Sequence, residues 1–487
     1  MDATTAPARH APLTHGERRR IVFGVLLPLF LGSLDQTSLA TALPIIGAEL
    51  GHVTSLPWLI TIYLLASTAI TPLYGKISDI HGREFTLRVA LMVYVAGSLV
   101  CALAPNFYVL LAGRALHGLG GGGLTSLAMV VLGDVASPRD RGRYYAYFSA
   151  VFTTSGACGP VFGGFLAQHV HWTAIFWINV PAGIAALVLM NVLLRRLPRH
   201  ERPHRLDVLG AVFIVVASVA FMLMLNVGGK AYPWLSAPVA GLAVAAAVGG
   251  LCFVARLRRA PEPLIPITIL ADPVVRCAMG VNVFGWGAII ALNIFLPIFL
   301  QSVMRLSASG AGLSLIVLMA TVNVSAGASG QMLGRVTHYK RLPIFGLALS
   351  VAGVAALAWR AGDVTVVELQ LILALIGIGF GPVAPLSTVS LQNAVQTHQF
   401  GTTLGAMSFL RSLYATMLIA AAGAVVLGGA ISPDALVAGA AQPTPAQLSE
   451  SFRWVFAGTA ASMAVGLLCL IALEERPLDT DEARGHV

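Results

Sequence analysis

The sequence predicts an all-α, polytopic membrane protein with fourteen transmembrane helices. Three observations lead to this fold class: an apolar composition, fourteen apolar runs of bilayer-spanning length, and basic residues that collect on alternate connections. Of the 487 residues, 57% are hydrophobic and only 10% are charged, whereas a soluble domain carries about 25% charged residues. We therefore expect the lipid bilayer to be the main surrounding of this chain.

The apolar runs give the expected helices in chain order. A hydrocarbon core about 30 Å thick requires about 20 residues of helix. Such runs fall at 21–44, 54–75, 85–104, 107–132, 144–168, 174–194, 208–228, 234–255, 275–303, 309–333, 342–360, 365–392, 401–430 and 452–473. The first run resembles a signal peptide, but it exceeds the usual apolar core of about 7–15 residues. We interpret it as the first membrane helix.

Basic residues provide an independent test of this count, because cytoplasmic connections carry an excess of lysine and arginine. Connections on the N-terminal side hold most of the 30 lysines and arginines, starting with residues 18–20. The opposite side holds only four, namely Lys230, Arg305, Arg360 and Arg453. This distribution predicts a multi-pass protein of the cell (inner) membrane with both termini in the cytoplasm. The net charge of +9 then reflects orientation, so we expect no nucleic-acid partner.

Cysteines and catalytic motifs give no sign of an enzyme. The five cysteines lie inside apolar runs without CxxC or other metal-ligand spacing, at positions 101, 158, 252, 277 and 469. The sequence contains no HExxH or GxSxG motif. We predict no metal site, no disulfide framework, no cofactor and no catalytic residues.

Two short patterns repeat along the chain. Residues 75–83 at the end of the second helix are echoed by 330–335, and the glycines of 118–123 are echoed by 377–381. Both offsets are near 255–260 residues, which predicts a parallel repeat of six helices with an inserted pair. The predicted units are an N-terminal six-helix bundle at 1–206, an inserted helix pair at 207–259 and a C-terminal six-helix bundle at 260–487.

Charged residues inside the apolar runs are the candidate functional groups. A central Asp or Arg costs roughly 2.5–3.5 kcal/mol on insertion scales, and Asp35, Arg114 and Arg411 are in such positions. Asp35 and Arg114 are expected ~15 Å and ~10 Å from the outer ends of their helices, so they could face one cavity. A dry site favours a protonated Asp35, whereas Arg114 favours the carboxylate. A conformational change could therefore load and unload a proton; the alternative is a static ion pair between the first and fourth helices.

Other polar and aromatic residues are weaker candidates. His117, one turn from Arg114 on the same helix face, could titrate or simply hydrogen-bond. Arg411 could bind an anionic group or hydrogen-bond to carbonyls of neighbouring helices. With these two, the candidate substrate-cavity residues are Gln36, Trp286, Asn293, Asn323 and Phe409. For any single one of them, ordinary packing between helices is the alternative.

The fifth helix carries a run of small residues around a proline. Its members are Gly156, Gly159, Pro160, Gly163 and Gly164. The proline removes a backbone hydrogen bond, and the glycines allow another helix to approach closely. Together they predict a pliable surface against a moving partner helix.

At these residues the chain resembles the major facilitator superfamily, and specifically its fourteen-helix drug:proton antiporters of the EmrB/QacA type. Residues 75–83 match the family's loop motif between helices two and three. Residues 34–44 match its first-helix motif with the acid, 114–120 its fourth-helix motif, and 159–164 its antiporter motif. Residues 175–183, and residues 392–395 with 409–411, are also typical of the subfamily.

This resemblance implies the major facilitator fold, with two six-helix bundles plus two inserted helices. It implies a monomer that exports lipophilic or amphiphilic small molecules, such as drugs, in exchange for protons by alternating access. Proton coupling would belong to Asp35 and Arg114. The cytoplasmic gate motif would consist of Gly75, Asp79, Gly82 and Arg83.

Departures from the family pattern narrow the expected substrate. His117 stands where the family usually has glutamine, and helices ten and thirteen lack the extra acids of some dication exporters. These departures favour exchange of one proton for a neutral or singly charged amphiphile. Two alternatives stay open: a metabolite uptake symporter of the same superfamily, which 159–164 disfavours, and a membrane-embedded lipid-handling enzyme, for which no catalytic motif is present.

Overall fold

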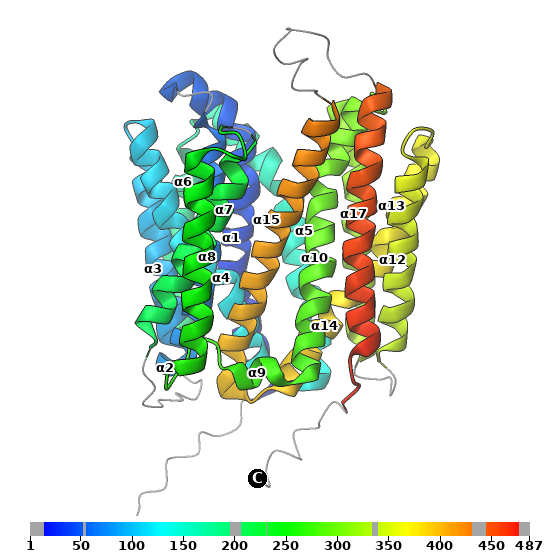
Figure 1. The fold of residues 1–487 in the computed structure, drawn as a ribbon. Helices are drawn as coiled ribbons and strands as arrows, with labels where there is room; N and C mark the ends of the chain where they lie inside the picture. The colour runs from blue at the N-terminus through cyan, green and yellow to red at the C-terminus, as the bar shows by residue number, and fades with distance from the viewer. Residues whose placement is uncertain are drawn as a thin grey trace, which may run out of the picture.

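The structure is a computed structural model that describes residues 14–51, 55–194, 206–229, 231–333, 339–430 and 445–476. In this part of the chain every long element is a helix, and the only β pairing is an isolated bridge between Gly228 and Tyr232. Fourteen helices are long and apolar enough to cross a membrane. The predicted all-α, fourteen-helix fold class is confirmed (Figure 1).

The helices follow one another through short connections. The membrane-spanning ones are α1 (His15–Leu50), α2 (Pro57–His81), α3 (Arg83–Ala102), α4 (Phe107–Val135), α5 (Pro138–His169), α6 (Ala174–Leu193), α7 (Val208–Val227), α8 (Ala237–Arg259), α10 (Pro273–Ser302), α11 (Ala308–Leu333), α12 (Arg341–Arg360), α13 (Val366–Phe380) with α14 (Val383–Ala394), α15 (Phe400–Ala430) and α17 (Pro445–Ala472). The short α9 (Ile267–Ala271) precedes α10, and a 3-10 turn (Thr397–Gln399) precedes α15.

Several helices begin earlier than the apolar runs because polar caps lie outside those runs. Thr14 accepts a hydrogen bond from the backbone of Glu17, and Glu17 bonds back to Thr14, which makes a capping box at the start of α1. Ser137 accepts from the backbone of Asp140 at the start of α5. These caps satisfy backbone N–H groups that have no partner inside the helix.

One predicted helix is divided in two. The run 365–392 forms α13 and α14, which are interrupted at Gly381 and Pro382. Proline lacks the backbone N–H that would continue the helical ladder. A Cβ on Gly381 would lie 2.5 Å from the carbonyl oxygen of Val322, so glycine also allows α11 to pass close to the break.

The contacts of the first six helices recur among the last six. The α3–α4, α2–α4, α1–α5 and α3–α6 contacts correspond to α12–α13, α11–α13, α10–α15 and α12–α17. A large buried cluster, which includes Leu292, Phe299 and Phe456, fills the C-terminal helices, and smaller clusters fill the N-terminal ones. The unit boundaries at 206/207 and 259/260 stay a prediction, which this repetition supports.

The α7 and α8 helices pack against each other, and α7 also contacts α2 and α15 (Figure 1). Asp207 caps α7 by accepting from the backbone of Gly210, and it also accepts from Arg256 of α8 at 2.9 Å. The pair is thus closed by an ion pair at one end.

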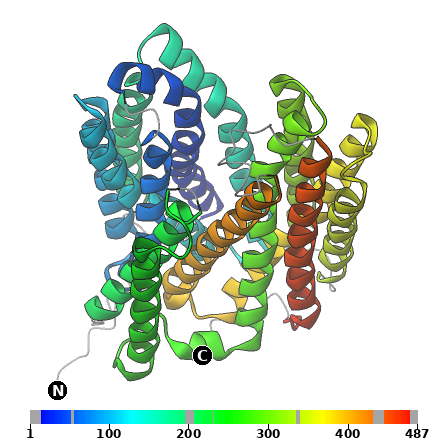
Figure 2. The ribbon, with the colours of Figure 1, turned by 45° about the horizontal axis from the view of Figure 1, so that its top comes forward.

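The strongest contacts between the two bundles join α2 to α15 and α5 to α11. They lie where α2 ends and α15 begins, which is the end of the molecule that also contains the start of α1. From there the helices of the two bundles diverge toward the opposite end (Figure 2). In this conformation the two bundles are therefore in contact at the end of the molecule where α1 begins and α17 ends.

Candidate functional site: a buried ion pair and an inter-bundle latch

A buried ion pair connects α1 to α4. Arg114 Nη1 lies 2.7 Å from Asp35 Oδ2, and the exposed fractions of the two side chains are 1% and 0%. Arg114 Nε also donates to the carbonyl of Leu59 in α2, at 3.1 Å. The guanidinium lies over the ring of Tyr63 at 4.4 Å and over that of Phe176 at 5.8 Å. Arg114 of α4 therefore contacts α1, α2 and α6 around one carboxylate.

Two further side chains complete this cluster. Arg114 Nη1 lies 3.1 Å from His117 Nδ1, and Nδ1 lies 3.7 Å from Asp35 Oδ2. Because a guanidinium only donates, Nδ1 accepts, and the proton of a neutral imidazole is then on Nε2. That Nε2 is buried without a partner in the described part of the chain. Asn179 Nδ2 of α6 donates to the other oxygen of Asp35 at 3.5 Å.

Asp35, Arg114 and His117 were predicted from the sequence to lie at a similar depth, and in the structure they are in contact. His117 is enclosed, with its ring 4.1 Å from that of Tyr94, so in this conformation it lies inside the N-terminal bundle. Sequence reasoning missed Asn179 as an individual residue. Its signal was available, because it is an unexplained polar residue in the middle of an apolar helix.

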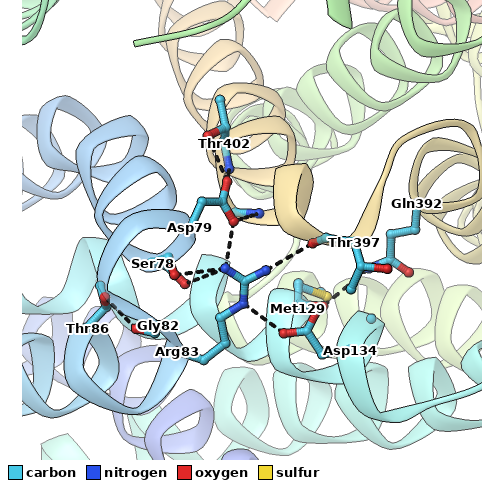
Figure 3. Close-up of polar contacts among 12 residues, drawn as sticks. Ser78, Asp79, Gly82, Arg83, Thr86, Met129, Asp134, Gln392, Thr397 and Thr402 are labelled. Atoms are coloured by element: carbon cyan, nitrogen blue, oxygen red, sulfur yellow. Dashed lines mark hydrogen bonds and ion pairs between the residues drawn. The ribbon is translucent and has the colours of Figure 1, made fainter. Parts of the chain in front are cut away.

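A second charged cluster lies at the closed end of the molecule (Figure 3). Arg83 Nη1 lies 2.6 Å from Asp79 Oδ1, and Nε lies 2.7 Å from Asp134 Oδ2. The same guanidinium donates to the carbonyls of Ser78 at 2.8 Å and Thr397 at 3.0 Å. Thr397 belongs to the other bundle, so Arg83 bridges the two bundles. Asp79 and Arg83 were predicted from the sequence as members of the gate motif, whereas Asp134 was not.

Asp79 binds the first turn of α15 in the opposite bundle (Figure 3). Its Oδ1 accepts from the backbone of Gly401 at 3.0 Å, and its Oδ2 accepts from the backbone and hydroxyl of Thr402 at 2.6 and 2.8 Å. A helix N-terminus has unpaired N–H groups and a positive dipole end, which favour a carboxylate. Asp79 therefore acts as a cap donated by one bundle to a helix of the other.

Glycines permit the bundles to touch at this end. A Cβ on Gly75 would lie 2.2 Å from the carbonyl oxygen of Gly401. A Cβ on Gly330 of α11 would lie 2.2 Å from the carbonyl oxygen of Gly142 of α5. Gly82, between α2 and α3, has a φ of +88°, which residues with a side chain rarely adopt. Within the gate motif, Gly82 thus allows the turn between α2 and α3, and Gly75 allows the backbones of α2 and α15 to touch.

Gln392 adds another polar contact between the bundles. Its Nε2 donates to the carbonyl of Met129 at 3.2 Å and lies 3.4 Å from the hydroxyl of Tyr145. Nearby, the guanidinium of the fully buried Arg141 lies 5.2 Å from the ring centroid of Phe400. These contacts could not be predicted, because nothing in the local sequence of these residues indicates which partner each one meets.

Two glycines of the antiporter motif form the α1–α5 contact. A Cβ on Gly159 would lie 1.8 Å from Thr37 Oγ1, and one on Gly163 would lie 2.2 Å from the carbonyl oxygen of Ser38. Thr37 Oγ1 also donates to the carbonyl of Ser155 in α5 at 3.0 Å. These glycines bring α5 close to the segment of α1 that carries Asp35.

The other members of the motif are less confined. A Cβ on Gly156 would meet nothing within 4 Å, and one on Gly164 would only touch Thr41 at 3.9 Å. Pro160 lies within α5, which is assigned as one continuous helix. The predicted pliable surface is therefore closely packed against α1 at Gly159 and Gly163 and more open at Gly156 and Gly164.

The predicted cavity residues have different surroundings in the structure: some contact one another, one is buried in the hydrophobic core, and others hydrogen-bond to their own helix. The guanidinium of Arg411 lies 5.7 Å from the ring of Trp286, so these two lie together between α15 and α10. Phe409 is buried in the C-terminal cluster. Asn293 and Asn323 donate to carbonyls of their own helices, at 2.9 and 2.6 Å.

Gln36, the residue after Asp35, is exposed in this conformation. Among the described residues, no three His, Cys, Asp or Glu side chains are grouped to hold a metal ion.

Comparison with known proteins places this arrangement in a family. Residues 25–418 match the Major Facilitator Superfamily. The chain is 30% identical over 415 residues to "Multidrug transporter protein MdtP" of Bacillus subtilis, which covers 84% of this chain and 75% of that protein. It is 30% identical over 429 residues to "Multidrug resistance protein 3" of the same organism, covering 87% and 81%.

A solved structure shares the fold at low identity. The human organic anion transporter MFSD10 (TETRAN) has a TM-score of 0.65 and 17% identity, and the match covers 94% of this chain and 99% of that one. The family match spans most of the chain, and the fourteen helices fit the multidrug branch. The protein is therefore a multi-pass transporter that belongs to the Major Facilitator Superfamily.

Proposed function

We propose that this transporter exports lipophilic or amphiphilic small molecules across the cell membrane in exchange for protons. The observation that carries this proposal is the enclosed Asp35–Arg114 ion pair, whose side chains are 0% and 1% exposed. The names of its relatives, which include two multidrug proteins, support the class of substrate. Loss of charge on Asp35 is the step that would link proton uptake to conformation.

Protonation would weaken the contact between α1 and α4. Removing one charge of a buried pair leaves the other uncompensated, at a cost of about 3–5 kcal/mol. Because Asp35 is enclosed, a proton reaches it only when these helices move apart. A ligand that binds one conformation better than another shifts the population toward the conformation that it binds. Here the ligand is the proton. Asp35 would then load a proton in one conformation and release it in another.

The cluster of Arg83, Asp79 and Asp134, which we call the latch because it joins the two bundles, has a place in the same transport cycle. If both termini are cytoplasmic, as the basic connections predict, the end closed by Asp79 and Arg83 faces the cytoplasm. This conformation would then face outward, and substrate would leave from it. Asp35, which is enclosed here, would take up a proton from the outside only after α1 and α4 move apart. Inward movement of one proton supplies about 2.3 kcal/mol per 100 mV. That energy corresponds to tens-fold accumulation of substrate, because about 1.4 kcal/mol equals a tenfold ratio.

Uptake into inverted membrane vesicles tests this proposal. A proton-driven exporter accumulates dyes or antibiotics from a panel when the vesicle lumen is acidic, and Asp35→Asn should abolish accumulation above equilibrium. An uptake symporter would instead drive its substrate out of the lumen along with protons. Normal uphill accumulation by the Asn variant would overturn the assignment of coupling to Asp35.

A double variant separates coupling from a static structural pair. Asp35→Asn alone leaves Arg114 without its counter-charge, so loss of activity could reflect lost stability. Asp35→Asn with Arg114→Gln removes both charges. If the pair is only structural, the double variant should regain stability and uphill transport together; if it couples protons, stability returns and uphill transport does not.

A further inference from the structure

Resting on the proposed export function, we propose that Arg411 and Trp286 form a subsite for the anionic group of an aromatic amphiphile. The substrate class would be a singly charged organic anion, such as a carboxylate, sulfonate or phosphate attached to an aromatic body. The inference follows from an arginine inside the membrane that has no hydrogen-bonding partner among the described residues and lies beside an aromatic ring.

Arg411 differs from the other arginines buried between the helices. Arg83 and Arg114 each make ion pairs and hydrogen bonds at 2.6–3.1 Å. Arg411, which is part-buried, makes no hydrogen bond or ion pair within the described part of the chain, and its guanidinium lies 5.7 Å from the ring centroid of Trp286. A ring face attracts a cation but leaves the five N–H donors of a guanidinium unsatisfied.

Among the described residues, no carboxylate forms an ion pair with Arg411. The spans of the C-terminal half contain only Glu368 and Glu450 as acids. Glu368 caps the far end of α13, and Glu450 pairs with Arg453 near the start of α17. Asp79, which α15 does meet, binds the first turn of that helix, about nine residues or ~14 Å from Arg411. The missing counter-charge would have to come from a ligand.

The position of Arg411 is fixed by contacts one turn further along α15. The hydroxyl of Tyr414 lies 2.9 Å from Ser462 Oγ, and Ser462 Oγ donates to the carbonyl of Phe284 at 2.9 Å. The Tyr414 ring also packs edge-on against that of Phe284, at 4.8 Å. Residues three apart share a helix face, so Arg411 and Tyr414 both face α10, where Arg411 lies over the ring of Trp286.

The ring beside Arg411 provides the apolar half of the subsite. Trp286 is part-buried and packs edge-on against Phe380 at 5.6 Å. A planar guanidinium binds carboxylate, sulfonate or phosphate oxygens through two parallel hydrogen bonds. The indole then offers a stacking surface for the body attached to that anion. A cationic amphiphile would meet an uncompensated positive charge here.

A matched pair of fluorescent probes tests the subsite without any proton gradient. 1-Anilinonaphthalene-8-sulfonate is anionic, and N-phenyl-1-naphthylamine has the same aromatic scaffold without the sulfonate. Equilibrium binding of each is measured to the protein in phosphatidylcholine nanodiscs, with protein-free nanodiscs as the blank. The parent is compared with Arg411→Gln, Arg411→Lys and a control, Arg360→Gln, which removes an exposed arginine at the end of α12.

The proposal predicts that the parent binds the sulfonate more tightly than the neutral probe. Arg411→Gln should weaken sulfonate binding by about tenfold or more, since a hydrogen-bonded charge is lost. Binding of the neutral probe should stay within about twofold, Arg411→Lys should be intermediate, and Arg360→Gln should match the parent. Equal loss for both probes, no loss for the sulfonate, or no saturable binding by the parent would overturn the proposal.

Two further measurements show whether the anion is a soluble ligand or a lipid, and separate a failure of this subsite from a failure of the proposed proton coupling. A lipid phosphate could bring the same chemistry, so binding is repeated in nanodiscs that contain added phosphatidylglycerol. Unchanged sulfonate affinity is expected of a soluble ligand, whereas strong competition by phosphatidylglycerol would assign the site to a lipid and overturn the proposal. Asp35→Asn should keep sulfonate binding even though it loses proton-driven transport, so failure of either proposal is seen separately.

Discussion

His117 shows how one residue is fitted to the ion pair. Its Nδ1 accepts from Arg114, and its ring is enclosed by aromatic neighbours such as Tyr94. The family usually has glutamine at this position, and a glutamine side-chain oxygen can accept the same hydrogen bond. We therefore expect the position to require a hydrogen-bond acceptor, independent of whether the side chain can titrate.

Substitutions at His117 test this requirement. His117→Gln should fold and transport like the parent, because Arg114 keeps an acceptor. His117→Leu leaves a buried donor unpaired and should lower stability by about 1–3 kcal/mol. Thermal unfolding of the purified variants checks this. Equal melting temperatures for the Gln and Leu variants would show that the hydrogen bond from Arg114 does not contribute to stability.

Asp79 is the second residue whose chemistry can be isolated. Asp79→Asn keeps a side-chain oxygen but loses the charge that binds Arg83 and the first turn of α15. The closed latch should weaken by about 1.5–3 kcal/mol, the usual worth of hydrogen bonds to a charged group. The conformation that is open at this end should gain population by about 10–100-fold.

Spin labels measure that shift. Labels at His81 and Gln396, both exposed near the latch, report the separation of α2 from α15 by pulsed electron resonance in a background without native cysteines. Asp79→Asn should broaden the distance distribution toward longer separations. Thr402→Val, which removes only the hydroxyl contact, should have a smaller effect. A distribution identical to the parent for both variants would refute a latch centred on Asp79.

Among the helices, the closest approaches occur where glycines replace side chains. In α5, Gly163 packs directly on the backbone of α1, whereas Gly156 has open space around its Cα. The same sequence motif thus contains positions with different structural roles. The spacing of the glycines alone does not distinguish them, because the difference depends on which face of α5 meets α1.

Alanine substitutions separate these roles. Gly163→Ala would place a methyl group 2.2 Å from the carbonyl oxygen of Ser38, so α1 and α5 must move apart, at a cost of about 1–3 kcal/mol. Gly156→Ala should change stability by no more than about 0.5 kcal/mol. Chemical or thermal unfolding in detergent measures both. Equal effects of the two alanines would contradict the observed packing of α5.

The apolar runs predicted which segments form helices, because a bilayer-spanning run has few alternatives to a helix. They did not predict the break at Gly381 and Pro382, since one proline in a long run is also compatible with a kink. For the site, charges inside apolar runs identified Asp35 and Arg114. The partners of Asp79 could not be predicted, because they are backbone N–H groups of Gly401 and Thr402, and any residue type supplies those.

In the whole molecule, the two bundles are joined at one end by backbone contacts and by the latch around Arg83. The buried pair of Asp35 and Arg114 lies within one bundle, away from that end. Coupling would therefore require that a change in the N-terminal bundle alters how it meets the C-terminal one. The α2 helix connects the two sites, since Leu59 accepts from Arg114 and Asp79 binds α15.

Proton movement driven by a substrate gradient is the most direct test of proton coupling through Asp35. Purified protein is placed in liposomes with a trapped pH indicator, and a gradient of a transported dye is imposed. The parent should move protons against the direction of the dye. The charge-neutral pair Asp35→Asn with Arg114→Gln should carry dye only down its gradient and leave the internal pH unchanged. Proton movement at the parent rate in that double variant would contradict proton coupling through Asp35.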